Sequence, residues 1–224
     1  MSSPEAKLQH YRTEFITSSL AADALKFGSF TLKSGRQSPY YFNSGMLNNG
    51  GLIATLASAY AALIAVEFPT LDVLFGPAYK GISLAATTAV ALRTEYGRSV
   101  GFAYNRKEAK DHGEGGWHVG ADIKGKKVLI LDDVFTTGTA VRQAAQGIRE
   151  GGGDIVGVVF ALDREEIGTD GEGESAKATL EKDLQSKVKS VLTMKELIGW
   201  LEDAGRKDDV EQMKEYREKY GIKA

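Results

Sequence analysis

The sequence predicts an α/β fold in which a parallel β-sheet is covered by helices on both faces. Short apolar runs of strand length alternate with helical patterns, and a strand that is apolar nearly throughout is typical of a sheet buried on both sides. Ligands of such sheets bind at the carboxyl ends of the strands. The expected strands cover residues 72–75, 99–104, 128–131 and 155–162, and the helices between them cover residues 82–95 and 140–150.

The remaining segments flank this alternating region. Residues 29–45 are rich in Ser, Gly and aromatic side chains, and their partial alternation predicts a small hairpin. After Arg164 the composition changes, and the Gly/Glu/Asp-rich stretch 168–175 is expected to be a flexible insertion whose role the sequence does not define. Further elements are expected as helices at residues 5–20, 52–66, 176–185, 194–203 and 208–220 and a strand at residues 188–192.

The bulk properties are those of a soluble, cytoplasmic protein. The chain has 224 residues, of which 42% are hydrophobic, enough for one domain with a sizeable core. A net charge of −2 gives no support for nucleic-acid or membrane binding, which usually leave a basic footprint. Cys is absent, which excludes disulfides and thiolate catalysis. We expect no signal peptide and no apolar run long enough to span a bilayer.

The most informative segment is residues 128–140, which read VLILDDVFTTGTA. An apolar strand ends in two acids, Asp132 and Asp133, and a Thr/Gly-rich loop then leads into a helix. Backbone N–H groups and hydroxyls at a helix N-terminus form a phosphate site, and Gly138 allows close approach of an anion. The two acids would repel phosphate but suit sugar hydroxyls or a metal. The segment therefore predicts a phosphate-binding site beside a pair of acids that bind sugar hydroxyls, which fits a phosphorylated ribose.

This segment resembles the phosphoribosyl diphosphate (PRPP) loop of the type I phosphoribosyltransferases. Other segments are similar to those of one branch, the orotate phosphoribosyltransferases; they read FTLKSGR at 30–36, SPYYFN at 38–43, FGPAYKG at 75–81 and NRKEAKDHGEGG at 105–116. The resemblance implies a parallel-sheet core from about residue 51 to 224. It also implies a small hood over the carboxyl ends of the strands, formed mainly by residues 1–50 with a possible C-terminal contribution.

The resemblance further implies transfer of ribose 5-phosphate from PRPP to orotate, in the pathway to UMP, with Mg²⁺ bound mainly through PRPP rather than by protein ligands. It implies a homodimer in which a mobile loop, residues 105–117, completes the site of the neighbouring subunit. By resemblance, catalysis falls to Arg106, Lys107, Lys110 and His112. The implied PRPP contacts are those four residues with Lys33, Tyr79, Lys80, Asp132, Asp133, Val134, Phe135, Thr136, Thr137, Gly138, Thr139 and Ala140.

Orotate is a flat anion, so its recognition needs aromatic surface and cations. Tyr41 and Phe42 offer ring packing and backbone contacts, and Arg164 offers a two-pronged partner for a carboxylate. Lys33 supplies a nearby charge, and the resemblance adds Thr136 from the PRPP loop. Packing within the hood is the alternative explanation for the aromatic residues.

Residues 106–116 contain cations, glycines and almost no apolar anchor, so we expect them to be mobile and to close on a departing diphosphate while excluding water. A solvated charged loop is the alternative. His112 and His118 have a loose metal spacing but lack a third ligand. Residues 120–127 nearly match a Walker A motif, but Lys127 replaces its Ser/Thr and a strand follows.

Three functions remain to be distinguished by experiment. The first is orotate phosphoribosyl transfer. A purine or uracil phosphoribosyltransferase would share the PRPP loop but would not need Lys33, Arg164 or the 105–117 loop. A PRPP-sensing regulator that binds nucleic acid would predict a basic face or an added DNA-binding domain, and a degenerate loop. Here the loop is intact and the chain is slightly acidic.

Overall fold

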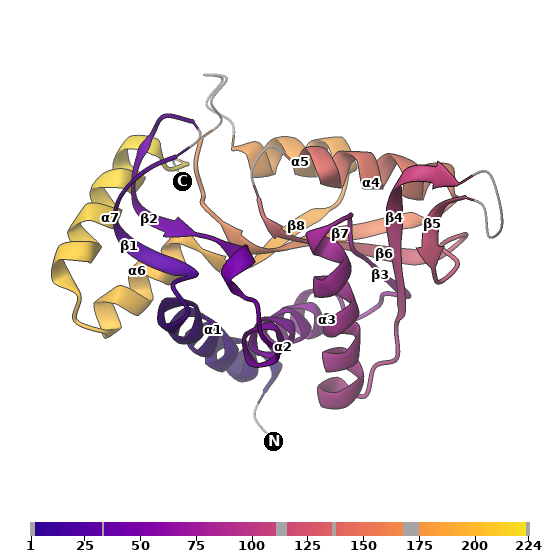
Figure 1. The fold of residues 1–224 in the computed structure, drawn as a ribbon, viewed down its shortest axis with the longest axis horizontal. Coiled ribbons are helices and arrows are strands. Elements are labelled where there is room, and N and C mark those ends of the chain that lie inside the picture. The colour runs from indigo at the N-terminus through magenta and orange to yellow at the C-terminus, as the bar shows by residue number, and fades with distance from the viewer. Residues whose placement is uncertain (1–2, 33, 111–115, 136–137, 168–174, 223–224) are drawn as a thin grey trace.

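The computed structural model describes residues 3–32, 34–110, 116–135, 138–167 and 175–222, and the side chains of residues 108–110 are not among the features described. A central six-stranded sheet has the order β5-β4-β3-β6-β7-β8, and a separate two-stranded sheet pairs β1 with β2 (Figure 1). The strands are β1 (Leu25–Thr31), β2 (Gln37–Phe42), β3 (Val73–Phe75), β4 (Gly101–Lys110), β5 (Gly116–Gly120), β6 (Lys127–Val134), β7 (Asp154–Asp163) and β8 (Lys187–Thr193).

The helices lie on both faces of the central sheet, as the sequence predicts (Figure 1). α1, α2 and α3 pack together on one face, and α4 and α5 lie on the other. Their bounds are α1 (Pro4–Ala21), α2 (Gly50–Glu67), α3 (Lys80–Tyr96), α4 (Thr139–Glu150), α5 (Ala176–Leu184), α6 (Met194–Asp203) and α7 (Lys207–Tyr220), with a short 3-10 helix η1 (Ser44–Met46) after β2.

The unbroken apolar strands are explained by two cores, one on each face of the sheet. Along β6, Leu129 and Leu131 join the core under α1–α3, whereas Val128 and Ile130 join the core under α4 and α5. Successive side chains of a strand point to opposite faces, so a strand covered on both sides must be apolar at every position. The predicted α/β class is therefore confirmed.

The sheet is not wholly parallel. β5 pairs with β4 in the antiparallel sense, and Trp117 of β5 stacks on Phe75 of β3 with a ring separation of 5.3 Å. The sequence predicts a loop over residues 105–117, because residues 106–116 contain almost no apolar anchor, whereas β5 begins at Gly116. Main-chain pairing with β4 and the packing of Trp117 hold β5 in place, and sequence periodicity reveals neither.

Helix α2 is long and apolar, and by length and composition it passes the test for a membrane span, with a mean hydropathy of 1.6. Our expectation that no segment would do so was wrong. In the fold α2 packs between α1 and α3 and against the sheet, and buries residues from Leu56 to Ile64. Its hydrophobicity is explained by this position, since a helix surrounded by other elements has little polar surface.

The β1–β2 hairpin lies beside the C-terminal helices rather than on the central sheet (Figure 1). β2 contacts α7, and α7 in turn packs on α6. By contrast α1, which precedes the hairpin in sequence, packs along α2. The division into a hood over residues 1–50 and a core from residue 51 stays a prediction.

Candidate active site

The two acids of the 128–140 segment occupy the last residues of β6 rather than the loop after it. Asp132 pairs with Phe160 of β7, and its carbonyl oxygen accepts a 2.8 Å hydrogen bond from the buried hydroxyl of Tyr60. The backbone N–H of Asp133 donates to Oδ1 of Asp132 at 3.0 Å. These bonds fix the orientation of both acids on a rigid element, as a binding site requires.

Asp133 is held by two groups that are far away in sequence. Lys80 Nζ, at the start of α3, lies 2.8 Å from Oδ2 of Asp133, and Ser44 Oγ donates to the same oxygen at 2.5 Å. Lys80 also donates to Ser44 Oγ at 2.8 Å. The sequence pointed to Lys80 and Asp133 separately, but not to their ion pair or to Ser44.

The pKa values of the two carboxyls are shifted in opposite directions. Burial, followed by repulsion from Asp133, raises the pKa of Asp132 to about 6. Burial alone would also raise the pKa of Asp133, but hydrogen bonds from Lys80 and Ser44 outweigh it and hold that pKa below its ordinary value. Asp133 is therefore the firmly ionised member of the pair.

The 75–81 segment turns from β3 into α3 and is packed too tightly for any residue but glycine at Gly76. A Cβ there would come within 2.0 Å of the carbonyl oxygen of Gly81. The backbone N–H of Ala78 donates to Oδ1 of Asn105 at 2.9 Å, so the turn is tied to β4. Tyr79 is 69% exposed, and Lys107 Nζ lies 4.3 Å from the centre of its ring. Tyr79, Lys80 and Lys107 are thus brought to one edge of the site.

The 105–117 segment differs from the unpaired loop that we expected. Residues 105–110 continue strand β4, Asn105 pairs with His118, and Lys110 pairs with Gly116. Nη1 of Arg106 donates to the carbonyl oxygen of Gly116 at 3.1 Å. The segment is a β-hairpin at its base, because main-chain pairing does not need the apolar side chains that we looked for. Residues 111–115, with His112, lie outside the described residues, as does the side chain of Lys110.

The PRPP-loop segment is described only at its two ends. Val134 ends β6, and buried Phe135 packs on Phe160 with 5.0 Å between ring centres. Gly138 caps α4 with φ +70°, a conformation that glycine adopts without strain, and it offers no side-chain oxygen to the first N–H groups. Thr139 and Ala140 begin α4 and are exposed. Thr136 and Thr137 lie outside the described residues.

Arg164 follows β7, next to the acidic end of β6, and is tightly held. Its Nε lies 2.6 Å from Oε1 of Glu166, its Nη2 donates to Ser38 Oγ at 2.7 Å, and its guanidinium lies 4.1 Å from the centre of the Tyr40 ring. Ser38, Tyr40 and Glu166 were not among the predicted site residues. Ser38 and Tyr40 lie in the 38–43 segment that carries the family resemblance, and Glu166 stands two positions after Arg164; these were the available signals.

The aromatic residues of β2 have separate environments. Tyr41 is 42% exposed and packs beside Phe30 with 5.6 Å between ring centres. Phe42 instead meets Phe15 of α1 edge-on at 6.0 Å. The ring of Phe42 therefore contributes to packing, which favours the alternative explanation for that side chain. Lys33 lies outside the described residues.

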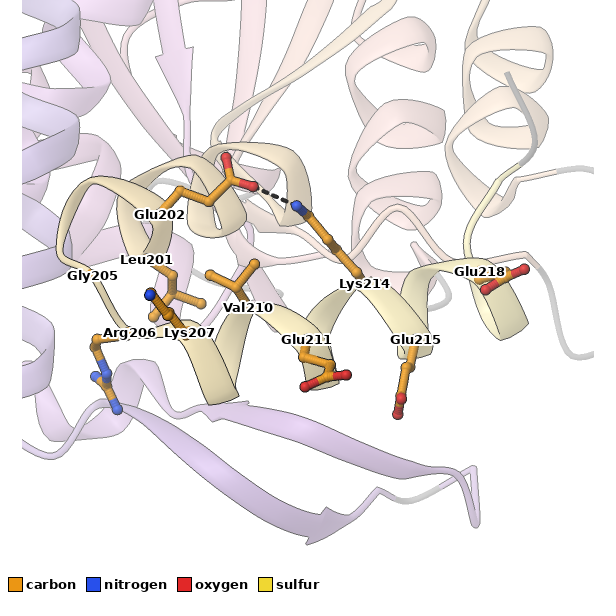
Figure 2. Close-up of a pocket in the computed structure, with 10 residues that line it drawn as sticks. All are labelled: Leu201, Glu202, Gly205, Arg206, Lys207, Val210, Glu211, Lys214, Glu215 and Glu218. Carbon is orange, nitrogen blue, oxygen red and sulfur yellow. Dashed lines mark hydrogen bonds and ion pairs between the residues drawn. The ribbon is translucent and has the colours of Figure 1, made fainter.

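A surface cavity of about 520 Å³ lies between α6 and α7 (Figure 2). It is open, it is lined by charged side chains of both signs, and Glu202 and Lys214 form an ion pair across it at 2.6 Å. None of its lining residues is one of the strand-end residues described above. We therefore place the candidate active site at the ends of β3, β4, β6 and β7.

Comparison with known proteins shows the family to which the chain belongs. A family model described as phosphoribosyl transferase domain matches residues 46–208, so the chain belongs to the phosphoribosyltransferase family. Within it, the chain belongs to the orotate phosphoribosyltransferases. It is 51% identical to that enzyme of Acinetobacter baumannii (strain ACICU) over 93% of this chain and 95% of the relative.

Two further relatives extend the likeness to another kingdom and to a solved structure. The orotate phosphoribosyltransferase of Schizosaccharomyces pombe is 47% identical, with 95% of this chain and 99% of the relative covered. The crystal structure of the Francisella tularensis orotate phosphoribosyltransferase is 40% identical, with a TM-score of 0.84 over 93% of this chain and 99% of that one. The fold and the predicted enzyme class are thereby confirmed.

Proposed function

We propose that the protein transfers the ribose 5-phosphate group of PRPP to orotate, giving orotidine 5′-monophosphate and diphosphate on the route to UMP. The observation that carries this proposal is the pairing of opposite chemistries on adjacent strands. β6 ends in two acids suited to ribose hydroxyls, and neighbouring β7 leads into a fixed guanidinium suited to a carboxylate. A sugar and an anionic base held at these points would meet between the two strand ends.

The chemistry is displacement at C1′ of the ribose, through an oxocarbenium-like transition state in which negative charge builds on the diphosphate. In our proposal Asp132 and Asp133 hold the ribose hydroxyls, and the N-terminus of α4 holds the 5′-phosphate. Lys80 then stands where a cation can meet the departing diphosphate, and Lys107 would supply a second cation from the neighbouring subunit in the dimer proposed below. Groups placed to meet charge that develops in the transition state lower the barrier, and tight binding of the ground state alone does not.

Mg²⁺ fits this site as a cation carried by the substrate. The described residues contain no group of three or more His, Asp or Glu side chains placed to hold a metal ion. Asp132 and Asp133 could add oxygen contacts to an ion that the diphosphate already chelates, because Mg²⁺ prefers hard oxygen ligands. When bound, the ion would supply positive charge to the leaving group.

A direct assay tests the function. Purified protein is mixed with PRPP, Mg²⁺ and either orotate, uracil or adenine, and consumption of each base is followed by absorbance. We expect turnover of orotate alone and loss of turnover when EDTA chelates the metal. Use of uracil or adenine in preference to orotate, or no use of any base, would overturn the proposal.

We also propose a cytoplasmic homodimer in which the 105–117 segment reaches the site of the neighbouring subunit. Support comes from the exposed position of Lys107 on a hairpin at the sheet edge. Mixing Lys107→Ala protein with Asp132→Asn/Asp133→Asn protein gives dimers with one complete shared site, so about half of their sites should regain activity. Confirmed subunit exchange without any recovery of activity would place Lys107 in its own subunit's site.

A further inference from the structure

The carboxylate of Glu166 accepts hydrogen bonds from three side chains and has no role in the function proposed above. Its Oε1 receives Nε of Arg164 at 2.6 Å and the hydroxyl of Tyr216 at 2.9 Å, and its Oε2 receives Nη1 of Arg36 at 3.0 Å. The three donors come from the end of β7, from α7 and from the hairpin. The Glu166 side chain is 14% exposed, so its charge is largely withdrawn from water and depends on these partners.

The backbone around Glu166 is equally fixed. Glu166 bridges to Gly221 in the antiparallel sense, and the N–H of Ile167 donates to the carbonyl oxygen of Tyr220 at 2.9 Å. Nη2 of Arg36 donates to the carbonyl oxygen of Ile167 at 3.1 Å. The chain after α7 therefore holds the segment that carries Glu166, and the carboxylate cannot easily follow a moving arginine.

These contacts leave the guanidinium of Arg164 little conformational freedom. Glu166 holds Nε, Ser38 holds Nη2, and the ring of Tyr40 lies against one face. These hydrogen bonds do not use Nη1. An arginine side chain has many rotamers, and an unrestrained arginine would lose that entropy on binding a ligand. Here that entropy is lost on folding instead.

Glu166 is also shared between two cations. Both Arg36 and Arg164 pair with its single carboxylate, so Glu166 does not neutralise Arg164 alone. The acids Asp163 and Glu165 adjoin Arg164 in sequence, and buried Asp163 is electrostatically coupled to Glu166. Arg164 therefore offers an anionic ligand a fixed geometry rather than a net charge of the cluster.

We propose that Glu166 is a positioning residue that presents Arg164 to the carboxylate of the base; this rests on the proposed function. It acts through Arg164 and does not touch the substrate. Tyr216 of α7 and Arg36 of the hairpin also bind the Glu166 carboxylate and help to orient it. Elements from both ends of the chain therefore determine the affinity for the base.

Glu166→Ala tests this assignment in steady-state kinetics. We expect the KM for orotate to rise about 10-fold, the effect of one charge-assisted hydrogen bond, with the KM for PRPP changed less than about two-fold. Glu165→Ala is the matched control, because that neighbouring carboxylate receives the N–H of Lys195 and not Arg164. The control should leave the KM for orotate within about two-fold of the parent value.

A double-mutant cycle separates positioning from a general structural effect. If Glu166 acts through Arg164, then Glu166→Ala adds less than about two-fold to the KM for orotate once Arg164 is already alanine. Full additivity of the two substitutions would overturn the proposal, as would an equal rise in the KM values for orotate and PRPP. Failure of the proposed function itself would be seen separately, as a parent enzyme that does not consume orotate.

Glu166→Gln keeps the test decisive should the alanine variant not fold. The amide keeps the length of the side chain and one oxygen for Nε of Arg164, but it loses the charge. We expect a smaller rise in the KM for orotate, about three-fold, with the same lack of additivity to Arg164→Ala. An unchanged KM in a folded Gln variant, together with additivity in the double variant, would refute the positioning role.

Discussion

The ends of β6 and β7 are neighbours in the sheet, yet the predicted site residues at the two ends carry opposite charge. At β6, two carboxyls share one lysine, since Lys80 pairs with Asp133. At β7, two arginines share one carboxylate, Glu166. Each end is joined to the hairpin region by a serine hydroxyl: Ser44 contacts Asp133, and Ser38 contacts Arg164.

The difference shows how one edge of a sheet can hold two unlike ligands. A hydroxyl both donates and accepts, so a serine can satisfy an acid at one end and a cation at the other. The two acids at β6 suit a polyol, and the fixed guanidinium of Arg164 after β7 suits a carboxylate. Substitutions at the two ends should therefore affect different substrates.

The largest effect is expected from removing both charges at β6. Asp132→Asn/Asp133→Asn should lower kcat/KM for PRPP by about 100-fold or more, because two ligands of the ribose lose their charge-assisted hydrogen bonds. Far-UV circular dichroism and thermal melting should show a native fold, since the pair lies at a strand end. A variant that fails to fold would mean that the acids are structural.

Removing the cation at β7 should affect the other substrate. Arg164→Ala should raise the KM for orotate about 10- to 150-fold, corresponding to about 1.5–3 kcal/mol for a charge-assisted pair, and should change the KM for PRPP far less. Arg206→Ala is a matched control, because Arg206 also lies over a ring, that of Phe27, and pairs with Asp209. Equal effects of Arg164→Ala on both substrates would exclude it as the base anchor.

The two acids of β6 should themselves differ in their effect on stability. The pKa of Asp132 is raised to about 6, above its ordinary value of 3.8. The folded state therefore binds its proton more tightly than the unfolded state does, and stability falls as the pH rises from about 4 to 6. Asn mimics the protonated form, so Asp132→Asn should stabilise the protein at pH 7.5 by about 1 kcal/mol, with the gain disappearing near pH 4.

Asp133 should behave in the opposite way. Its pKa is lowered, so its charge contributes stability above its ordinary pKa, and that contribution is lost as the pH falls through the folded value. Asp133→Asn should therefore lower the unfolding free energy at pH 7.5. Urea unfolding of both single variants at pH 7.5 and pH 4 measures the change in unfolding free energy and its sign for each variant. If both variants are stabilised at pH 7.5, the ion pair with Lys80 does not stabilise the fold.

The smallest effects are expected from the two serines. Ser44→Ala should raise the KM for PRPP and Ser38→Ala the KM for orotate, each about two- to ten-fold, because a single hydrogen bond contributes about 0.5–1.5 kcal/mol. Initial rates with each substrate varied in turn separate the two variants. The comparison between the strand ends fails if either serine variant affects both substrates alike.

The sequence by itself was sufficient for the fold class and for the strand ends that carry the site. Apolar runs alternating with helical patterns predicted the strands and helices, because burial on both faces of a sheet requires apolar residues at successive positions. Two acids after the run at 128–131, and Arg164 after the run at 155–162, then had to lie at the same edge. Those inferences rest on local pattern and on one topological rule, so a single sequence can support them.

The tertiary structure decided how those groups are held. Lys80 with Asp133, Ser38 with Arg164, and Arg36 and Tyr216 with Glu166 are contacts between residues 50 to 130 positions apart. Strand β5 likewise joins the sheet through its pairing with β4 and the stacking of Trp117 on Phe75. Sequence periodicity reports which face of an element is buried, but not which partner a polar side chain meets there. Partner choice follows from strand order and from the path of the chain ends, which only the folded molecule defines.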